Sequence, residues 1–145
     1  MAKIQRISAN GHTSASPEAV YALLEDREHW PDWSPLGKFR VLETGDRNGL
    51  GAIGVFSTNG VNACEEVIAL EPGKRFGYTL RKGMPLRDYR AYVDLTPALG
   101  GTDIHWHASF VPKIPGTGGL YRRFLGRFFG RMVDGLVARA SRGAP

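Results

Sequence analysis

The fold is decided by the last long segment of the chain, residues 120–142, which reads LYRRFLGRFFGRMVDGLVARASR. Its apolar residues come in adjacent pairs that recur every four positions, from Leu120 and Tyr121 to Leu136 and Val137. This pattern predicts one long amphipathic helix. Because a repeat of four exceeds the helical period of 3.6, the apolar stripe turns by about 40° per repeat, which suits a diagonal path across a twisted sheet.

The sheet that this helix requires is predicted by the residues before it, from Lys38 to Val111. Short β segments separated by turn signals fill this stretch, a pattern typical of an antiparallel meander. Asn59-Gly60 is the clearest hairpin signal, because both turn positions need a positive φ. With a first segment at about Lys3–Ser14, the pattern gives about seven strands. The other turn signals lie at 45–49, 72–73, 83–85 and 100–101.

Two short elements are predicted between the first strand and the meander. Ser16-Pro17-Glu18 supplies an N-cap, a proline for the first helical position and an acidic residue in the first turn. A short amphipathic helix should therefore run to about Arg27. Prolines then bracket a turn that carries Trp30 and Trp33, which predicts irregular or briefly helical backbone.

Composition is that of one folded domain over residues 1–145, with 42% hydrophobic and 23% charged residues. The single cysteine, Cys64, excludes an internal disulfide and is expected to be a small buried apolar residue, because no histidine stands beside it. No Cys/His cluster indicates a zinc site. The N-terminus has no continuous apolar stretch, and no apolar run is long enough to span a bilayer, so we expect a cytoplasmic protein without a transmembrane segment.

The net charge of +5 raises the question of an anionic partner, either nucleic acid or a membrane surface. Arginines recur along the whole chain, and only the last helix shows a local excess. A solvated basic face is therefore favoured over a patch that binds either partner. The oligomeric state does not follow from the sequence.

Several stretches, in this order and spacing, carry a resemblance to a known family. They are ASPEAVY at 15–21, WPDWSP at 30–35, LEPGKRF at 70–76, RDYR at 87–90, GGTDIHW at 100–106 and VPKIPGTG at 111–118. Together they resemble the SRPBCC or START-like superfamily, in particular its polyketide cyclase/dehydrase and lipid-transport branch. The resemblance covers essentially the whole chain.

This resemblance implies an α+β helix-grip fold, also called START-like or Bet v 1-like. A curved, seven-stranded antiparallel sheet should wrap around the long C-terminal helix, with two short helices after the first strand. It also implies a cavity between sheet and helix. The leading hypothesis is that this cavity binds a small hydrophobic ligand, lipid-like, polyketide or aromatic, without a cofactor. The alternatives are a polyketide cyclase, aromatase or dehydrase, or a basic peripheral module that binds anionic lipid or nucleic acid.

Candidate ligand contacts are aromatic residues, although plain core packing explains an aromatic stripe equally well. The two tryptophans after the first helix could form a gate at the cavity mouth or cap the edge of the core. The candidates are Trp30, Trp33, Phe56, Tyr78, Tyr89, Trp106, Phe124 and Phe128.

Candidate general acid/base groups are Glu66, Tyr78, Tyr89 and Arg90. Glu65 and Glu66 must point to opposite faces of their strand, and the alternation does not settle which carboxylate faces the cavity.

Two further pairs have testable positions. His105 and His107 should lie on the outer face of the last strand, and with no third ligand in view a solvated pair is favoured over a metal site. Gly126 and Gly130 cost about 1 kcal/mol each in a helix interior, which suggests either close approach to the sheet or room for a ligand.

Overall fold

The computed structural model describes residues 3–142, in which seven strands form a single antiparallel sheet in the order β1-β7-β6-β5-β4-β3-β2. The fold class and the strand number are as predicted. The strands are β1 (Gln5–Thr13), β2 (Lys38–Glu43), β3 (Ile53–Thr58), β4 (Val61–Glu71), β5 (Arg75–Lys82), β6 (Leu86–Ala98) and β7 (Gly101–Pro112).

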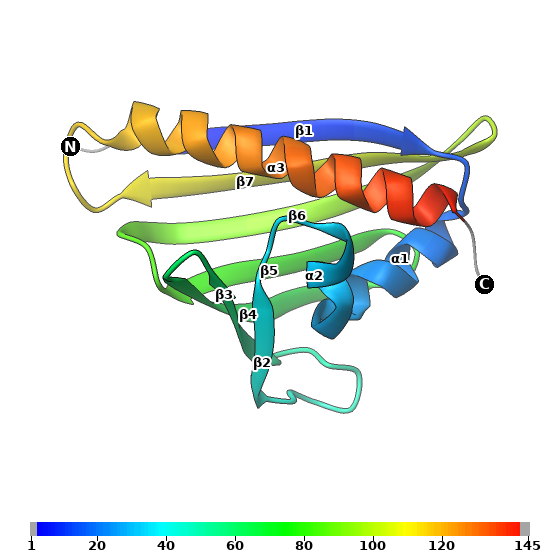
Figure 1. The fold of residues 1–145 in the computed structure, drawn as a ribbon, viewed down its shortest axis with the longest axis horizontal. Helices are drawn as coiled ribbons and strands as arrows, with labels where there is room; N and C mark the ends of the chain where they lie inside the picture. The colour runs from blue at the N-terminus through cyan, green and yellow to red at the C-terminus, as the bar shows by residue number, and fades with distance from the viewer. Residues whose placement is uncertain (1–2, 143–145) are drawn as a thin grey trace.

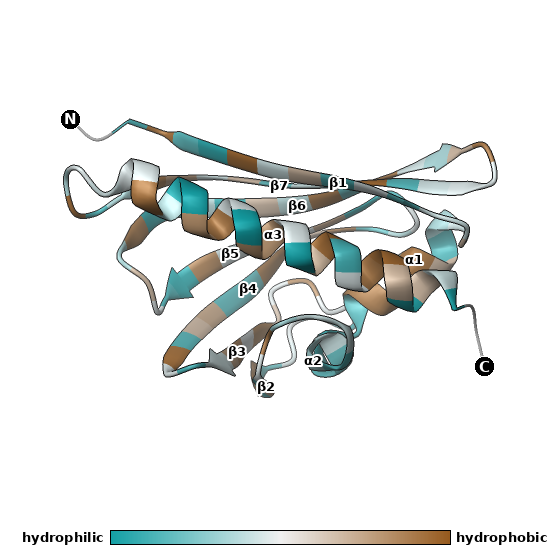
Figure 2. Ribbon diagram, turned by 45° about the horizontal axis from the view of Figure 1, so that its top comes forward, coloured by the Kyte–Doolittle hydropathy of each residue, from teal (hydrophilic) through white to brown (hydrophobic). Residues whose placement is uncertain are grey.

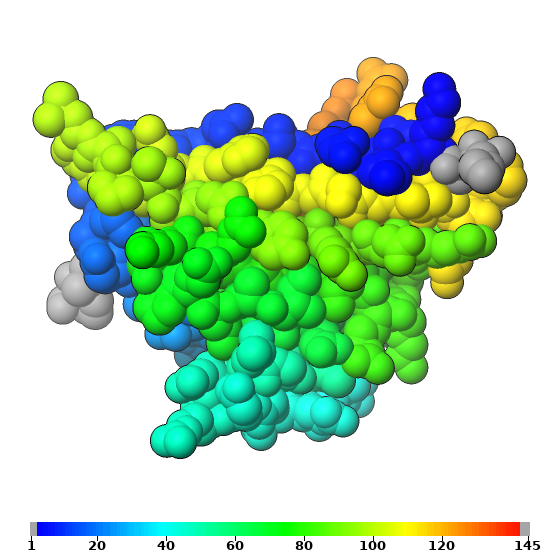
Figure 3. Space-filling view, turned by 180° about the vertical axis from the view of Figure 1, so that it is seen from behind, coloured from blue at the N-terminus to red at the C-terminus, as the bar shows by residue number. Residues whose placement is uncertain are grey.

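All of the helices lie on one face of this sheet. The long helix α3 (Gly118–Ser141) runs diagonally along β1 and β7 (Figure 1). The short helices α1 (Pro17–Glu25), η1 (Arg27–His29) and α2 (Trp30–Trp33) cover the half of the sheet near the end of α3. Seen from behind, the strands follow one another as bands of colour with no helix in front of them (Figure 3). The sheet therefore has a covered concave face and an open outer face.

The turn chemistry explains why the chain doubles back where it does. Asn59 has φ 49° and Gly60 has φ 84°, the two positive values that the hairpin between β3 and β4 requires. Register shifts interrupt the pairing of β4 with β5 between Cys64 and Glu65 and between Val67 and Ala69. Such bulges increase local twist and bend a strand, which contributes to the curvature of this part of the sheet.

Trp30 stands at the centre of the core, only 1% exposed. Its ring centroid lies 5.5 Å from those of Phe56 and Trp106, 5.7 Å from that of Phe76 and 6.0 Å from that of Tyr78. Its indole Nε1 donates to the backbone oxygen of Leu24 at 3.0 Å, so its one polar atom is satisfied. The space beneath the second half of α3, where the sequence predicts a cavity, is thus occupied by the protein's own aromatic side chains.

Helix α3 has the diagonal path that its sequence predicts, and it begins two residues earlier, at Gly118. Gly135 is the position of closest approach, because a Cβ there would overlap the backbone oxygen of Trp33. At Gly126 and Gly130 a Cβ would meet nothing within 4 Å, so the expectation of close approach at these two glycines is wrong. Within residues 3–142, no helix combines the length and hydropathy that crossing a lipid bilayer demands. The buried side chains of α3 are Leu125, Phe129, Met132, Val133, Leu136 and Ala140.

Candidate functional site

Glu65 is the carboxylate that β4 turns toward the concave face. Phe56 of β3 packs against Trp30, which identifies the inner face of that strand. Gly54, two residues earlier, shares this face and lies directly opposite Glu65. Glu66 points the other way, where its carboxylate accepts a hydrogen bond from Arg81 on the outer face. The structure thereby settles the alternative that the sequence left open.

Arg27 is the buried cation beside this carboxylate, only 6% exposed. Its guanidinium donates to the backbone oxygens of Glu65 at 3.4 Å and Ala52 at 3.3 Å, and it lies 5.1 Å from the ring centroid of Phe39. Burial lowers the pKa of Arg27, and the negative charge of Glu65 opposes this effect. Arg27 therefore ties η1 to the sheet and places a positive charge in an otherwise apolar region.

The Glu65 carboxyl is an incompletely satisfied group. Its Oε1 atom is buried and has no hydrogen-bond partner, although the residue as a whole keeps some exposed surface. Burial raises the pKa of this carboxyl to about 7, while the charge of Arg27 acts in the opposite direction. Near neutral pH the group therefore exists in both protonation states, and it can donate or accept a hydrogen bond.

Two tyrosines on the concave face extend the polar cluster. The indole Nε1 of Trp106 donates to the hydroxyl oxygen of Tyr78 at 3.2 Å, and the hydroxyls of Tyr78 and Tyr89 share a hydrogen bond. Burial raises the pKa of both tyrosines, and the negative charge of Glu65 raises it further. Both phenols therefore remain protonated and available as hydrogen-bond donors.

A hollow of about 320 Å³ opens between the end of α1 and the β2–β3 loop and reaches the concave face. Arg27 forms part of its wall, and Val67 of β4, the inward neighbour of Glu65, lies in its floor. Acidic residues stand at its rim on α1, η1 and β2. The apolar side chains that line it are Phe39, Val41, Ala52, Val67, Leu70 and Phe76.

The aromatic residues predicted to contact ligand lie in three places: the core, the polar cluster and the helix α3. Trp30, Phe56 and Trp106 are core side chains exposed by 1% or less, while Tyr78 and Tyr89 belong to the polar cluster. Trp33 is also buried, and its Nε1 atom has no hydrogen-bond partner.

The helix phenylalanines lie apart from the polar cluster. Phe128 is partly buried against the core, whereas Phe124 is 59% exposed on the outside of α3. The structure therefore separates Phe124 from the concave face on which it was expected to contact ligand.

The acid/base candidates are divided in the same way. Glu66 and Arg90 lie on the outer face, where Arg90 is exposed beside Tyr92 and His107, so neither joins Tyr78 and Tyr89. Arg27 is the residue of this candidate site that the sequence did not indicate. An arginine directly after an amphipathic helix reads as a solvated end residue, and only the tertiary structure shows that it is buried.

The outer face carries a separate cluster on β6 and β7. His105 and His107 point outward as predicted, with ring centroids 4.4 Å apart, and Asp94 lies beside them, its Oδ2 atom 2.7 Å from His107 Nε2. Arg75 donates to both carboxylate oxygens of Asp94. Burial opposes ionisation of Asp94, but the hydrogen bonds from Arg75 and His107 hold its pKa below the usual value. Asp94 is thus a third potential ligand beside the two histidines, so the expectation of none was wrong. Its ion pair with Arg75 accounts for its position.

Comparisons with known proteins identify the architecture. The family described as polyketide cyclase/dehydrase and lipid transport matches residues 5–141. No curated protein matches the chain significantly. A START superfamily protein from Mycobacterium smegmatis superposes with a TM-score of 0.81 at 15% identity, over 96% of this chain and 99% of that one.

Two further solved structures show the same fold. A protein from Thermus thermophilus has a TM-score of 0.77 at 21% identity, over 97% of this chain and 99% of its own. The di-domain ARO/CYC StfQ from the steffimycin biosynthetic pathway has a TM-score of 0.80 at 14% identity. This superposition covers 96% of the present chain and 51% of StfQ.

Proposed function

The chain belongs to the polyketide cyclase/dehydrase and lipid-transport family, and we propose on this basis that it binds a small hydrophobic ligand carrying a hydroxyl group. The ligand occupies the hollow between α1 and the β2–β3 loop, with its apolar body over Phe39, Val67 and Phe76 and its polar end toward Arg27. Glu65 does not line the hollow, and its carboxyl is reached past Arg27, which donates to the Glu65 backbone oxygen. We place this activity in the cytoplasm, which the single unpaired cysteine supports.

One observation carries the proposal, namely the buried Oε1 atom of Glu65, which has no hydrogen-bond partner although Arg27 lies nearby. A buried polar group without a hydrogen bond costs free energy, so native proteins rarely retain one without a reason. A ligand hydroxyl would supply the missing donor, and the apolar lining of the hollow would supply the binding energy.

The test compares 1-naphthol with naphthalene, which differ by one hydroxyl group, in solution with the purified protein. The wild type should bind 1-naphthol more tightly, because the hydroxyl donates to the Glu65 carboxyl. Glu65→Gln should reduce this preference about tenfold, since a hydrogen bond to a charged group contributes about 1.5–3 kcal/mol. An unchanged preference in Glu65→Gln would remove Glu65 from the proposal.

A second variant tests the location. Leu70→Trp places a bulky ring in the lining of the hollow and should weaken the binding of both compounds. Leu42→Trp is the matched control, because Leu42 is 48% exposed on β2 and does not line the hollow. Equal affinities in the two variants would show that the ligand binds elsewhere. Native mass spectrometry of the purified protein would identify any ligand that co-purifies.

A cyclase is the second candidate function, favoured by the pKa of about 7 at Glu65. A general base is most effective when its pKa lies near the working pH. The Glu65 carboxylate would take the proton from a carbon between two carbonyls, and the resulting enolate would attack another carbonyl of the same chain. Tyr78 or Tyr89 would donate a hydrogen bond to the developing oxyanion. Consumption of a linear poly-β-ketone by the wild type, and its loss in Glu65→Gln, would support this function over simple binding.

A further inference from the structure

The first half of α3 presents an apolar ridge to solvent rather than to the sheet. Leu120 is 68% exposed and Phe124 is 59% exposed, and Phe128 continues the ridge toward the core. These residues are four apart, so they follow one another along one side of the helix. Figure 2 shows apolar and polar residues interleaved along α3, including its first turns. Burying such large side chains in an apolar environment would be favourable, and within residues 3–142 Leu120 and Phe124 remain largely uncovered.

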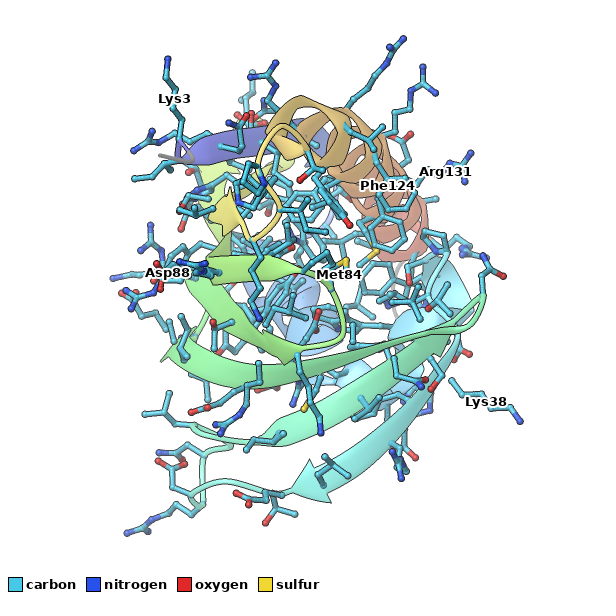
Figure 4. The ribbon with its side chains drawn as sticks, turned by 90° about the vertical axis from the view of Figure 1, so that its left-hand side faces the viewer. Lys3, Lys38, Met84, Asp88, Phe124 and Arg131 are labelled. Atoms are coloured by element: carbon cyan, nitrogen blue, oxygen red, sulfur yellow. The ribbon has the colours of Figure 1, made fainter. Side chains whose placement is uncertain are left out.

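A second ridge of three arginines runs beside the first. Arg123, Arg127 and Arg131 are also four apart, and they line the same groove of about 390 Å³ as Leu120, Phe124 and Phe128. In Figure 4 Phe124 and Arg131 both project from α3 on the side away from Lys3. Apolar and cationic side chains are therefore presented together on one surface.

The charge of this surface is not neutralised within the protein. Among residues 3–142 no carboxylate pairs with these three arginines, whereas Arg75 and Arg81 on the sheet each have an acidic partner. No acidic residue occurs between 118 and 133, and the first one on α3 is Asp134. The groove thus needs an anionic partner that also accepts large apolar side chains.

We propose that this face of α3 docks on the surface of an anionic lipid bilayer. Leu120 and Phe124 enter the boundary between headgroups and acyl chains, and the three arginines contact lipid phosphates. A nucleic acid would also attract the arginines, but it offers no apolar layer for the parallel ridge of leucine and phenylalanine. The surface goes beyond the proposed function, because the ligand hollow is lined by α1, η1, the strands and the β2–β3 loop and by no residue of α3.

The electrostatic part is tested by sedimentation with phosphatidylcholine vesicles, with and without phosphatidylserine. The wild type should bind only the vesicles that contain phosphatidylserine, and less at high salt. Each arginine near the surface contributes about fivefold, so Arg123→Gln, Arg127→Gln and Arg131→Gln together should weaken binding about 100-fold. The matched control replaces Arg6, Arg87 and Arg90, three exposed arginines of β1 and β6, by glutamine and should bind as the wild type does. Equal losses in the two triple variants would show a general charge effect and overturn the proposal.

The apolar part is tested with a reporter at the ridge itself. Trp30, Trp33 and Trp106 are at most 7% exposed, so their emission should not respond to a membrane. Phe124→Trp should shift to shorter emission wavelengths on adding the anionic vesicles, whereas the exposed control Leu42→Trp should not. Phe124→Ser should reduce vesicle binding at least tenfold, because a buried phenylalanine contributes that much to apolar transfer. An identical response of the two tryptophan reporters would contradict insertion at this face.

A short duplex DNA serves as the counter-probe. If DNA binds more tightly than the vesicles and Phe124→Ser leaves DNA binding unchanged, the face is a nucleic-acid surface and the membrane proposal fails. Binding of 1-naphthol in solution without vesicles is measured on the same variants and should be unaffected. Loss of the vesicle result alone therefore contradicts only this inference, and loss of naphthol binding in the wild type contradicts only the proposed function.

Discussion

At the scale of single residues, the inner face of β4 determines how the protein responds to pH. Glu65 is the inward member of an adjacent pair of carboxylates, and it faces Gly54 in a tightly packed part of the sheet. Its raised pKa means that the native state takes up a proton between about pH 4.5 and 7 that the unfolded chain does not. The stabilising effect of this protonation is complete below pH 4.5 and is lost as the pH rises through 7.

Glu65→Gln should therefore flatten part of the pH dependence of stability. The difference between 4.5 and about 7 corresponds, at about 1.4 kcal/mol per pH unit, to about 3 kcal/mol. The free energy of unfolding of the variant minus that of the wild type should therefore increase by about this amount as the pH rises from 4.5 to 8. Urea denaturation at each pH measures it. Glu66→Gln, which removes the neighbouring carboxylate from the outer face, is the control. If the free energy of unfolding depended on pH in the same way in Glu65→Gln and in the wild type, the burial of this charge would be contradicted.

Arg27→Met should be strongly destabilising above pH 7. It removes two hydrogen bonds to backbone oxygens and leaves the Glu65 charge buried without a counter-ion. Each buried carbonyl oxygen left without its donor costs about 1–3 kcal/mol. In the Glu65→Gln background, Arg27→Met should cost less than it does in the wild type, because no buried carboxylate is then left behind, and a double-mutant cycle measures the difference. An equal cost in the two backgrounds would show that the two side chains do not interact.

The sequence predicted the outer histidines and the buried cysteine correctly, because strict strand alternation and residue type determine them. It could not choose between Glu65 and Glu66, because the register shift at Cys64 lies within the segment where alternation would have to be counted. It also could not find Arg27, whose burial depends on the carbonyls that β4 and the β2–β3 loop present to it.

At the scale of elements, the position of α3 depends on Gly135 and not on Gly126 and Gly130, the two glycines that the sequence pattern singled out. Gly135 allows the helix to lie directly on the backbone of Trp33, whereas Gly126 and Gly130 face open space. The glycine spacing alone gave no indication of this difference. Only the position of α2, which the sequence predicted as briefly helical backbone without placing it against the long helix, decides which glycine is needed.

Alanine substitutions should separate these glycines. Gly135→Ala should destabilise the protein by about 1–3 kcal/mol, the usual range for overpacking, because its methyl group overlaps a backbone oxygen. Gly126→Ala and Gly130→Ala should each stabilise it by about 1 kcal/mol through helix propensity. Thermal unfolding followed by circular dichroism measures all three changes. A neutral Gly135→Ala would show that α3 is free to move away from α2.

At the scale of the whole molecule, the antiparallel meander and the diagonal helix were predicted because turn residues and hydrophobic periodicity repeat along the entire chain. The pairing of β1 with β7 was not predicted. The contents of the concave face were not predicted. Periodicity shows which side chains point inward, but it does not show how large a volume they fill. Trp30 fills the space in which the sequence predicted a ligand, and the hollow lies instead beside the β2–β3 loop.

Trp30→Ala should convert this packed centre into a binding site. The loss of the ring should cost about 3–5 kcal/mol and leave a cavity among the surrounding aromatic rings. Added indole should then raise the melting temperature of Trp30→Ala more than that of the wild type, because the variant offers an enclosed second site in addition to the hollow. A variant whose melting temperature ignores indole would indicate that the core collapses onto the gap.

The edge strand β2 affects whether two molecules can associate through their sheets. It pairs with β3 alone, so the backbone N–H and C=O groups along its free edge can form hydrogen bonds with a strand of another molecule. Two exposed apolar residues, Val41 and Leu42, would be buried by such pairing and would stabilise it. The flanking charges of Lys38 and Arg40, the shortness of the strand and the irregular register after Val41 all work against it. Straightening this margin or removing its cations would turn a folded protein into one prone to form intermolecular β-structure.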